Sequence, residues 1–171
     1  SLGTSTGFAN ADSNIWPGFS KLVLIFFSLQ CACAGSTSGG IKVDRIIILW
    51  KSFVNQLRKM FHPKAVLAYR LDKTVIDQSI IEAGLIYVAL YLCVVFLSSL
   101  VLTLIGVDIM SAFSGSVAAM GNVGPGFGMV SSLSNFSQIP DLGKWILSLV
   151  MLLGRLEIFA LLMFLFYRVI R

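Results

Sequence analysis

The chain has 171 residues, a net charge of +5 and a mean hydropathy of +0.88, with 57% hydrophobic and only 12% charged residues. A soluble domain carries about 25% charged residues, so the composition favours an integral membrane protein over a soluble protein with an unusually large core. The three cysteines form no CxxC pair and the one histidine, His62, is not near them, which argues against a disulfide framework and a zinc site. There is also no nucleophile–histidine arrangement, so an enzyme is not expected.

The first segment reads as a polar loop followed by a broken helix. The loop is "TSTGFANADSN", and the run "IWPGFSKLVLIFFSLQCACA" then begins a helix, with Pro17 tolerated in its first turn. The apolar run breaks at "GSTSGG" and resumes as "IKVDRIIILWKSFVNQL". The sequence therefore predicts one spanning helix that is interrupted in its middle.

The break at "GSTSGG" has two interpretations. Gly35 and Gly40 have the separation of a phosphate-binding loop, but Ile41 stands where that motif needs Lys, and Val43 replaces the Ser or Thr that would hold magnesium. Irregular backbone at membrane depth is tolerated only where it is buried in protein or lines a water-filled cavity. We therefore interpret the break as a pore-lining segment rather than a nucleotide site.

Basic residues are concentrated after the break. Eight of the thirteen Lys and Arg residues lie between Lys42 and Lys73, and such residues gather at the cytoplasmic ends of membrane helices. A nucleic-acid surface is the weaker alternative, because apolar residues and two aspartates interrupt the basic ones. We expect residues 62–78 to form a cytoplasmic linker that binds anionic lipid heads or a cytosolic partner.

The second half begins with one full span and one half-span. Ala83–Val107 comprises 25 residues without a charge, and a spanning helix needs about 20. Asp108 then predicts the N-cap of a helix of about 12 residues, roughly 18 Å long, which reaches half-way through a hydrocarbon core. The glycines and proline of "GNVGPGFG" end that helix, so the sequence predicts a re-entrant segment.

A second long apolar stretch, Leu142–Tyr167, contains "GRLE" in its middle. A charge there is expensive in lipid, so Arg155 is expected to face protein or water. The spacing leaves open whether Arg155 lines a pore as a barrier to cations or is a structural partner, and Glu157 fits a structural partner better than an ion ligand.

The two halves contain an internal repeat in parallel orientation, with the first copy shortened. In each copy a glycine loop precedes a long helix that glycine interrupts: Gly7 and Gly35 are 28 residues apart, and Gly124 and Gly154 are 30 apart.

Together, "TSTGFANADSNIWPG", "CAGSTSGGIKV" and "GNVGPGFG" with "MLLGRLEIF" resemble the TrkH/KtrB family of bacterial potassium uptake proteins, and "GRLEIF" points to its TrkH branch. The resemblance covers the whole chain. It implies an all-α membrane protein of potassium-channel-like helix–pore-loop–helix repeats, of which this chain is the end of the third unit and the complete fourth. In that scheme the segments are residues 1–61 (third-unit filter and broken second helix), 62–78 (linker) and 79–171 (fourth unit: span 79–107, pore helix 108–121, filter 122–127, outer loop 128–141 and second span 142–171).

The resemblance also implies roles for individual residues. The third and fourth filter loops would hold K⁺ on backbone carbonyls, and they comprise Ser5, Thr6, Gly7 and Phe8, and Asn122, Val123, Gly124 and Pro125. The intramembrane gating loop would comprise Cys33, Ala34, Gly35, Ser36, Thr37, Ser38, Gly39 and Gly40, with Arg155 in the pore below the filter.

The function expected from these features is potassium transport across the bacterial inner membrane, with K⁺ as cargo and no cofactor. The resemblance implies membrane lipid, a homodimer and a cytosolic nucleotide-binding regulatory subunit, similar to TrkA, as partners, and no nucleic acid. Two other functions stay open on the residues alone: a secondary transporter with broken helices, and a non-conducting scaffold that recruits a cytosolic partner.

Overall fold

The structure is a computed structural model that describes residues 4–30, 39–61, 70–71, 74–75 and 78–156. Within these ranges, helices make up nearly all of the regular structure. In chain order the elements are η1 (Ser13–Ile15), α1 (Gly18–Leu29), α2 (Val43–Phe61), β1 (Arg70–Leu71), β2 (Thr74–Val75), α3 (Gln78–Leu104), α4 (Ile109–Gly121), η2 (Gly128–Val130), η3 (Phe136–Gln138) and α5 (Asp141–Arg155).

A small hairpin lies in the segment 62–78, where only a linker was expected. Strands β1 and β2 pair antiparallel, with Arg70 opposite Val75 and Leu71 opposite Thr74. Strands of two residues build no core, so the fold class is still all-α.

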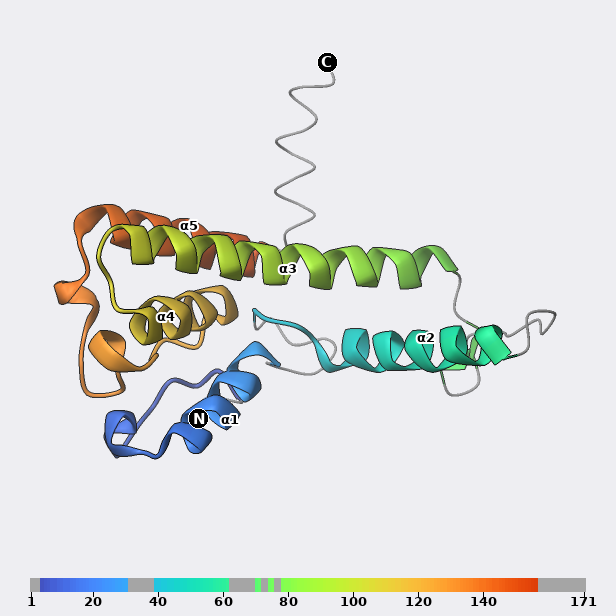
Figure 1. The fold of residues 1–171 in the computed structure, drawn as a ribbon, viewed down its shortest axis with the longest axis horizontal. Helices are drawn as coiled ribbons and strands as arrows, with labels where there is room; N and C mark the ends of the chain where they lie inside the picture. Colours follow the sequence, from blue (N-terminus) through green and yellow to red (C-terminus); the bar gives the residue numbers. More distant parts are fainter. Residues whose placement is uncertain (1–3, 31–38, 62–69, 72–73, 76–77, 157–171) are drawn as a thin grey trace, which may run out of the picture.

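Helix α3 forms the long axis of the molecule (Figure 1). Its 27 residues extend about 40 Å at 1.5 Å per residue, and Ser79–Leu104 is the one helix of the described residues that is long and apolar enough to cross a membrane. One stripe of α3 is buried against the other helices, namely Tyr87, Tyr91, Val95, Ser98 and Leu102. The apolar residues on its other faces are exposed, as in a helix that faces lipid or further protein.

The short helix α4 occupies the centre of the fold. It lies between α3 and α1 in Figure 1 and packs against α1, α3 and α5. From Ser111 to Gly121 every residue except Phe113 is buried. Serine, alanine and glycine predominate in this helix and allow its neighbours to approach closely. As predicted, Asp108 caps it, since the Met110 N–H donates to Asp108 Oδ2 at 3.1 Å.

Helices α1 and α2 follow one another beneath α3, and α2 lies along the half of α3 that extends away from α4 and α5 (Figure 1). The chain is not helical between Gln30 and Val43 in its described part, residues 39–42, which agrees with the predicted interruption. Helix α5 begins at Asp141 and is described as far as Arg155, so the remainder of the second span expected at 142–171 lies outside the described residues. The starts of α1 and α5, each near an exposed tryptophan, Trp16 and Trp145, lie at the same end of the molecule.

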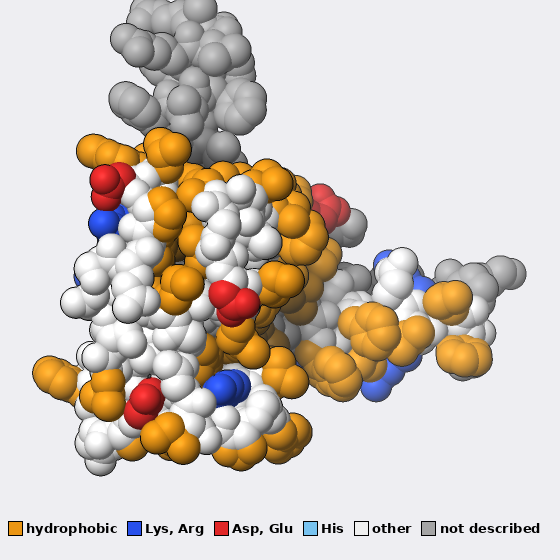
Figure 2. All heavy atoms as spheres, turned by 60° about the vertical axis from the view of Figure 1, so that its left-hand side comes forward, with side chains coloured by type: hydrophobic (Ala, Val, Ile, Leu, Met, Phe, Trp, Pro, Cys, Tyr) orange, Lys and Arg blue, Asp and Glu red, His pale blue; other side chains and the backbone are white. Residues whose placement is uncertain are grey.

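Many large hydrophobic side chains are exposed on the surface. Figure 2 shows hydrophobic side chains beside areas of backbone and uncharged polar side chains, with only isolated charged side chains among them. Large exposed hydrophobic residues occur on α1, α2, α3 and α5. Exposed apolar area of this extent marks contact with a membrane or with other protein segments.

Candidate ion-permeation site

Two glycine loops share an unusual backbone pattern. Positive φ angles occur at Ser5 (49°) and Gly7 (75°) in the first loop, and at Asn122 (53°) and Gly124 (105°) in the second. Each loop thus places two left-handed residues two positions apart, at equivalent places of the internal repeat. A residue with a Cβ atom is less stable in this conformation by roughly 1–2 kcal/mol. Its recurrence therefore indicates that the backbone path of both loops is specified by their surroundings.

The two loops are in contact. A Cβ atom added to Gly7 would lie 2.7 Å from the Val123 carbonyl oxygen and 3.7 Å from Pro125 Cδ. Only glycine permits this approach, because any larger residue would overlap the carbonyl. The side chains of Phe8, which is 83% exposed, and Thr6 lie on the surface of the described part. The structure therefore brings the two segments expected to form filter loops together through their backbones.

Helix α4 ends at this contact. The Asn122 backbone N–H donates to the Ala118 and Ala119 carbonyls, and the Val123 N–H donates to the Ala118 carbonyl at 2.9 Å. The C-terminal end of an α-helix carries a partial negative charge equivalent to about half an elementary charge. A short buried helix that ends at the glycine loop therefore favours a cation there.

Two serines of α4 hold the outward leg of the second loop. Ser114 Oγ donates to the Met110 carbonyl (2.7 Å) and accepts from the Phe127 N–H (2.9 Å). Ser111 Oγ accepts from the Met129 N–H (3.0 Å). Sequence reasoning gave these serines no role. The available signal was a pair of serines three residues apart in a short helix that precedes a glycine-rich loop.

Polar bonds also join the two loops at their outer ends. The side-chain amide of Asn14 is paired with the backbone of Gly128: Gly128 N–H donates to Asn14 Oδ1 at 2.8 Å, and Asn14 Nδ2 donates to the Gly128 carbonyl at 3.1 Å. Nearby, Ser132 Oγ accepts from the Ser13 N–H at 3.1 Å and donates to the Ala11 carbonyl at 2.8 Å. We call these four bonds the outer bridge.

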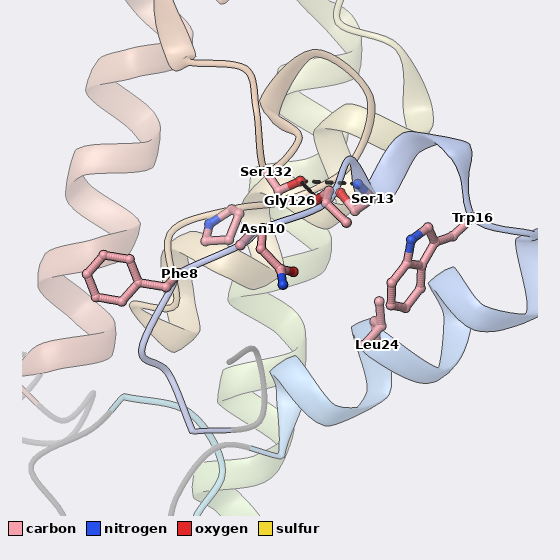
Figure 3. Close-up of a pocket in the computed structure, with 10 residues that line it drawn as sticks. Phe8, Asn10, Ser13, Trp16, Leu24, Gly126 and Ser132 are labelled. Carbon is pink, nitrogen blue, oxygen red and sulfur yellow. Dashed lines mark hydrogen bonds between the residues drawn. The ribbon is translucent and has the colours of Figure 1, made fainter.

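A cavity of about 180 Å³ opens beside the outer bridge. Figure 3 shows Trp16 and Leu24 on one side of it and Phe8 on the other, with Ser13 and Ser132 bonded between them. Its lining comprises Phe8, Ala9, Asn10, Ala11, Ser13, Trp16, Leu24, Pro125, Gly126 and Ser132. Both glycine loops therefore contribute to the walls of one cavity.

A second junction lies at the inner end of α4. A Cβ atom on Gly39 would lie 2.9 Å from the Met120 carbonyl oxygen and 3.1 Å from Asn122 Nδ2. A Cβ atom on Gly154 of α5 would overlap the same Met120 oxygen and lie 3.0 Å from its carbonyl carbon. Asn122 Nδ2 also donates to the Met151 carbonyl at 3.2 Å. The end of the interrupted segment, the end of α4 and helix α5 thus meet at one point.

The two ends of the interruption are themselves joined. The Ile41 N–H donates to the Leu29 carbonyl at 3.1 Å, and the preceding residue, Gly40, has φ +92°. Of the expected gating loop, Gly39 and Gly40 are described and buried, whereas residues 33–38 lie outside the described part.

Arg155 follows the close contact of Gly154 with Met120 and ends α5. It is exposed on the described part of the chain, and Glu157, expected as a structural partner, lies outside it. The family resemblance implies that Arg155 lies in the pore below the filter. The choice between a pore-facing and a structural role stays a prediction.

Arg45 anchors α2 to α3. Its guanidinium carbon lies 3.6 Å from the centre of the buried Tyr87 ring. A cation over an aromatic face contributes about 0.5–2 kcal/mol, more where water is excluded. This contact fixes the first turn of α2 immediately after the interruption, and no motif in the sequence pointed to it.

In the described ranges, no group of three or more His, Cys, Asp or Glu residues is placed to hold a metal ion. Cys93, which is exposed, carries a free thiol. The candidate for a cation site is the pair of glycine loops beside the end of α4, where backbone carbonyls would be the ligands.

Comparisons with known proteins agree on one family. The family model TrkH, described as a cation transport protein, matches residues 1–168. The Trk system potassium uptake protein TrkH of Escherichia coli K12 is 39% identical over 95% of this chain and 33% of its own length, and that of Halomonas elongata is 37% identical over 94% and 33%. The chain thus spans about a third of the length of these relatives, which are named as transport proteins and not as enzymes.

The fold agrees as well. The crystal structure of the potassium transporter TrkH from Vibrio parahaemolyticus matches with a TM-score of 0.81 and 37% sequence identity, over 96% of this chain and 35% of that one. The match confirms the expected fold class, an all-α membrane protein with helix–pore-loop–helix repeats.

Proposed function

Because the chain belongs to the TrkH family of cation transport proteins, we propose that it forms part of the pore of a potassium uptake protein. The relatives named above are potassium uptake proteins. The observation that carries the proposal is the pair of glycine loops with the same backbone pattern, which meet at Gly7 and Val123 beside the C-terminal end of α4.

The chemistry suits potassium passage. A potassium ion must lose water to enter a narrow path, and backbone carbonyls can replace its hydration shell. Glycine at the left-handed positions lets the backbone of the loops follow a path that other residues resist. The partial negative charge at the end of α4 stabilises the ion while it is partly dehydrated. In this proposal the ligands are the carbonyls of the two segments 5–8 and 122–125.

The inner junction is the proposed place of control. The segment 33–40 would narrow the path beneath the filter loops, and its described end, Gly39, lies against the end of α4. Arg155 would add a positive charge near the same level and so raise the energy of a passing cation. Motion of the segment or of the arginine would then open the path.

The proposed setting is the bacterial inner membrane, which the complete protein would cross several times. Basic residues of α2 and of the segment after it would lie on the cytoplasmic side, where anionic lipids and a nucleotide-binding regulatory subunit similar to TrkA would bind. A dimer, in which each protomer has its own pore, completes the proposal.

The test is a serine substitution in the second loop, with a matched control. Gly124 (φ +105°) and Gly106 (φ +96°) both have positive φ angles and open space where a Cβ atom would lie. Gly124→Ser and Gly106→Ser therefore bear similar backbone strain, but Gly106 lies in the connection between α3 and α4, away from the two loops. We expect only Gly124→Ser to lower the preference for potassium over sodium.

Uptake of potassium, rubidium and sodium by cells that lack other potassium uptake systems provides the measurement, at equal amounts of protein in the membrane. If well-expressed Gly124→Ser keeps the wild-type ion preference, the second loop does not form the filter. A saturable preference for an organic solute would instead favour a secondary transporter.

A further inference from the structure

The outer bridge joins two segments that are far apart in the sequence. Asn14 and Gly128 are separated by 114 residues, and Ala11 and Ser132 by 121. Residues 11–14 follow the first glycine loop, and residues 128–132 follow the second. The bridge therefore ties together the outer ends of the two loops whose inner parts meet at Gly7 and Val123.

We propose that Asn14 is a positioning residue for ion selectivity, because its amide sets the spacing of the two filter loops through the backbone of Gly128. The proposal rests on the function proposed above. In this proposal the carbonyl of Asn14 is not a ligand of the ion. It acts through Gly128 and the leg of the loop that leads from there to Gly124.

The amide group of Asn14 is suited to this task. It donates to the Gly128 carbonyl and accepts from the Gly128 N–H, so two bonds in opposite directions fix the position and the orientation of the backbone on both sides of Gly128. Gly128 itself has φ +68°, and an added Cβ atom would overlap Ser111 Oγ. The backbone that Asn14 holds at Gly128 therefore also lies close against α4, and in this proposal a displacement of it is transmitted along the loop.

Side-chain packing beside the outer bridge does little to fix the spacing of the two filter loops. The cavity of about 180 Å³ lies between the two loops beside the bridge. Ser13, which lines it, is 9% exposed, and its hydroxyl has no hydrogen-bond partner among the described residues. Where packing leaves a gap, the polar bonds across it carry more of the geometric constraint.

The experiment uses the full-length protein with two variants of Asn14 and one control. Asn14→Ala removes both bonds. Asn14→Asp keeps the shape and one acceptor, but it places a carboxylate oxygen against the Gly128 carbonyl, so it tests the amide pairing rather than the volume. Asn135→Ala is the control, because Asn135 lies in the same outer region and its side chain, among the described residues, bonds within its own turn to Ser137.

Two readouts are needed. The ratio of potassium to sodium uptake reports on selectivity, and hydrogen–deuterium exchange of the purified protein reports on the Gly128 and Met129 amides. We expect Asn14→Ala to lower the uptake ratio by roughly tenfold, the effect of losing two hydrogen bonds of ordinary strength, and to speed exchange at Gly128. Asn14→Asp, which keeps the acceptor for the Gly128 N–H but loses the donor to the Gly128 carbonyl, should also lower the uptake ratio, with less change in exchange at Gly128. The control should change neither.

Each other outcome overturns the proposal in a distinct way. Unchanged exchange at Gly128 in Asn14→Ala would show that Asn14 does not hold the backbone at that residue. Faster exchange with an unchanged uptake ratio would show that the bridge is only structural, as would an equal loss of potassium and sodium uptake. A wild-type protein without potassium preference would contradict the proposed function itself, and with it any selectivity role for Asn14, while the exchange data would still show whether the bridge exists.

Discussion

Replacing Gly154 with alanine should press α5 away from the end of α4. The new Cβ atom would overlap the Met120 carbonyl oxygen, and it would lie 3.0 Å from the Met120 carbonyl carbon and 3.1 Å from Asn122 Nδ2. Carbon atoms in ordinary contact are about 3.5–4.0 Å apart, so the Met120 carbonyl carbon alone requires the two elements to separate by roughly half an ångström to one ångström, and the overlapping oxygen requires more. That displacement acts on Asn122, whose amide bonds to Met151 at 3.2 Å.

The control is an alanine at Gly84, in the second turn of α3, where an added Cβ atom meets nothing within 4 Å. Both substitutions gain about 1 kcal/mol of helix propensity, so this gain cancels when the two variants are compared. Overpacking at a close contact destabilises by about 1–3 kcal/mol. Gly154→Ala should therefore be less stable than Gly84→Ala by about 1–3 kcal/mol, and it alone should alter ion preference.

Thermal unfolding in detergent and ion uptake in cells measure the two effects. The expected result is a lower unfolding midpoint for Gly154→Ala than for Gly84→Ala, together with a reduced potassium-to-sodium ratio. Equal stability and equal ion preference in the two variants would refute the close approach of α5 to Met120. Lower stability with normal ion preference would show that the inner junction does not influence the loops.

Three further predictions concern the proposed gate and the half-length helix. Deletion of residues 36–39 should raise potassium flux or remove its dependence on a regulatory subunit, and unchanged, fully regulated flux would make this segment a packing feature. Arg155→Ala should raise potassium flux by up to roughly a hundredfold, because a positive charge about 6 Å from a passing cation costs roughly 3 kcal/mol at an effective dielectric constant near 20. If the variant instead fails to insert and shows no gain of flux, Arg155 is part of a structural ion pair. Asp108→Ala should lower the free energy of unfolding by about 0.5–2 kcal/mol through loss of the N-cap, whereas unaltered thermal stability would show that this cap contributes little.

The local features of the fold were accessible from the sequence. The uncharged run up to Val107 predicted α3, and Asp108 with the glycines from Gly121 predicted a short capped helix, as found at Ile109–Gly121. The glycine-rich break before Val43 predicted the interruption between α1 and α2. Each of these depends on neighbouring residues: charge, capping groups and helix-breaking residues act over one or two turns.

The contacts that assemble the site were not accessible in the same way. The pairing of Asn14 with Gly128 and the approach of Gly39 to Met120 join segments that are distant in the chain. Their geometry depends on how α4 is placed among its neighbours, which no local pattern specifies. Glycine at position 39 was noticed as a helix breaker, but its space requirement against a carbonyl appears only when the helices are packed. The ion-binding roles of the two loops are still predictions.

The two serines that hold the outward leg of the second loop bear on how this chain enters a membrane during synthesis. The Phe127 and Met129 amides find their acceptors only 13 and 18 residues earlier in the chain, at Ser114 and Ser111. An amide left without a partner in hydrocarbon is destabilised by several kcal/mol. Because these acceptors lie in the helix directly before the loop, the re-entrant segment that begins at Asp108 can form its own hydrogen bonds as soon as it leaves the translocation machinery. These bonds do not depend on segments of the chain that are made later.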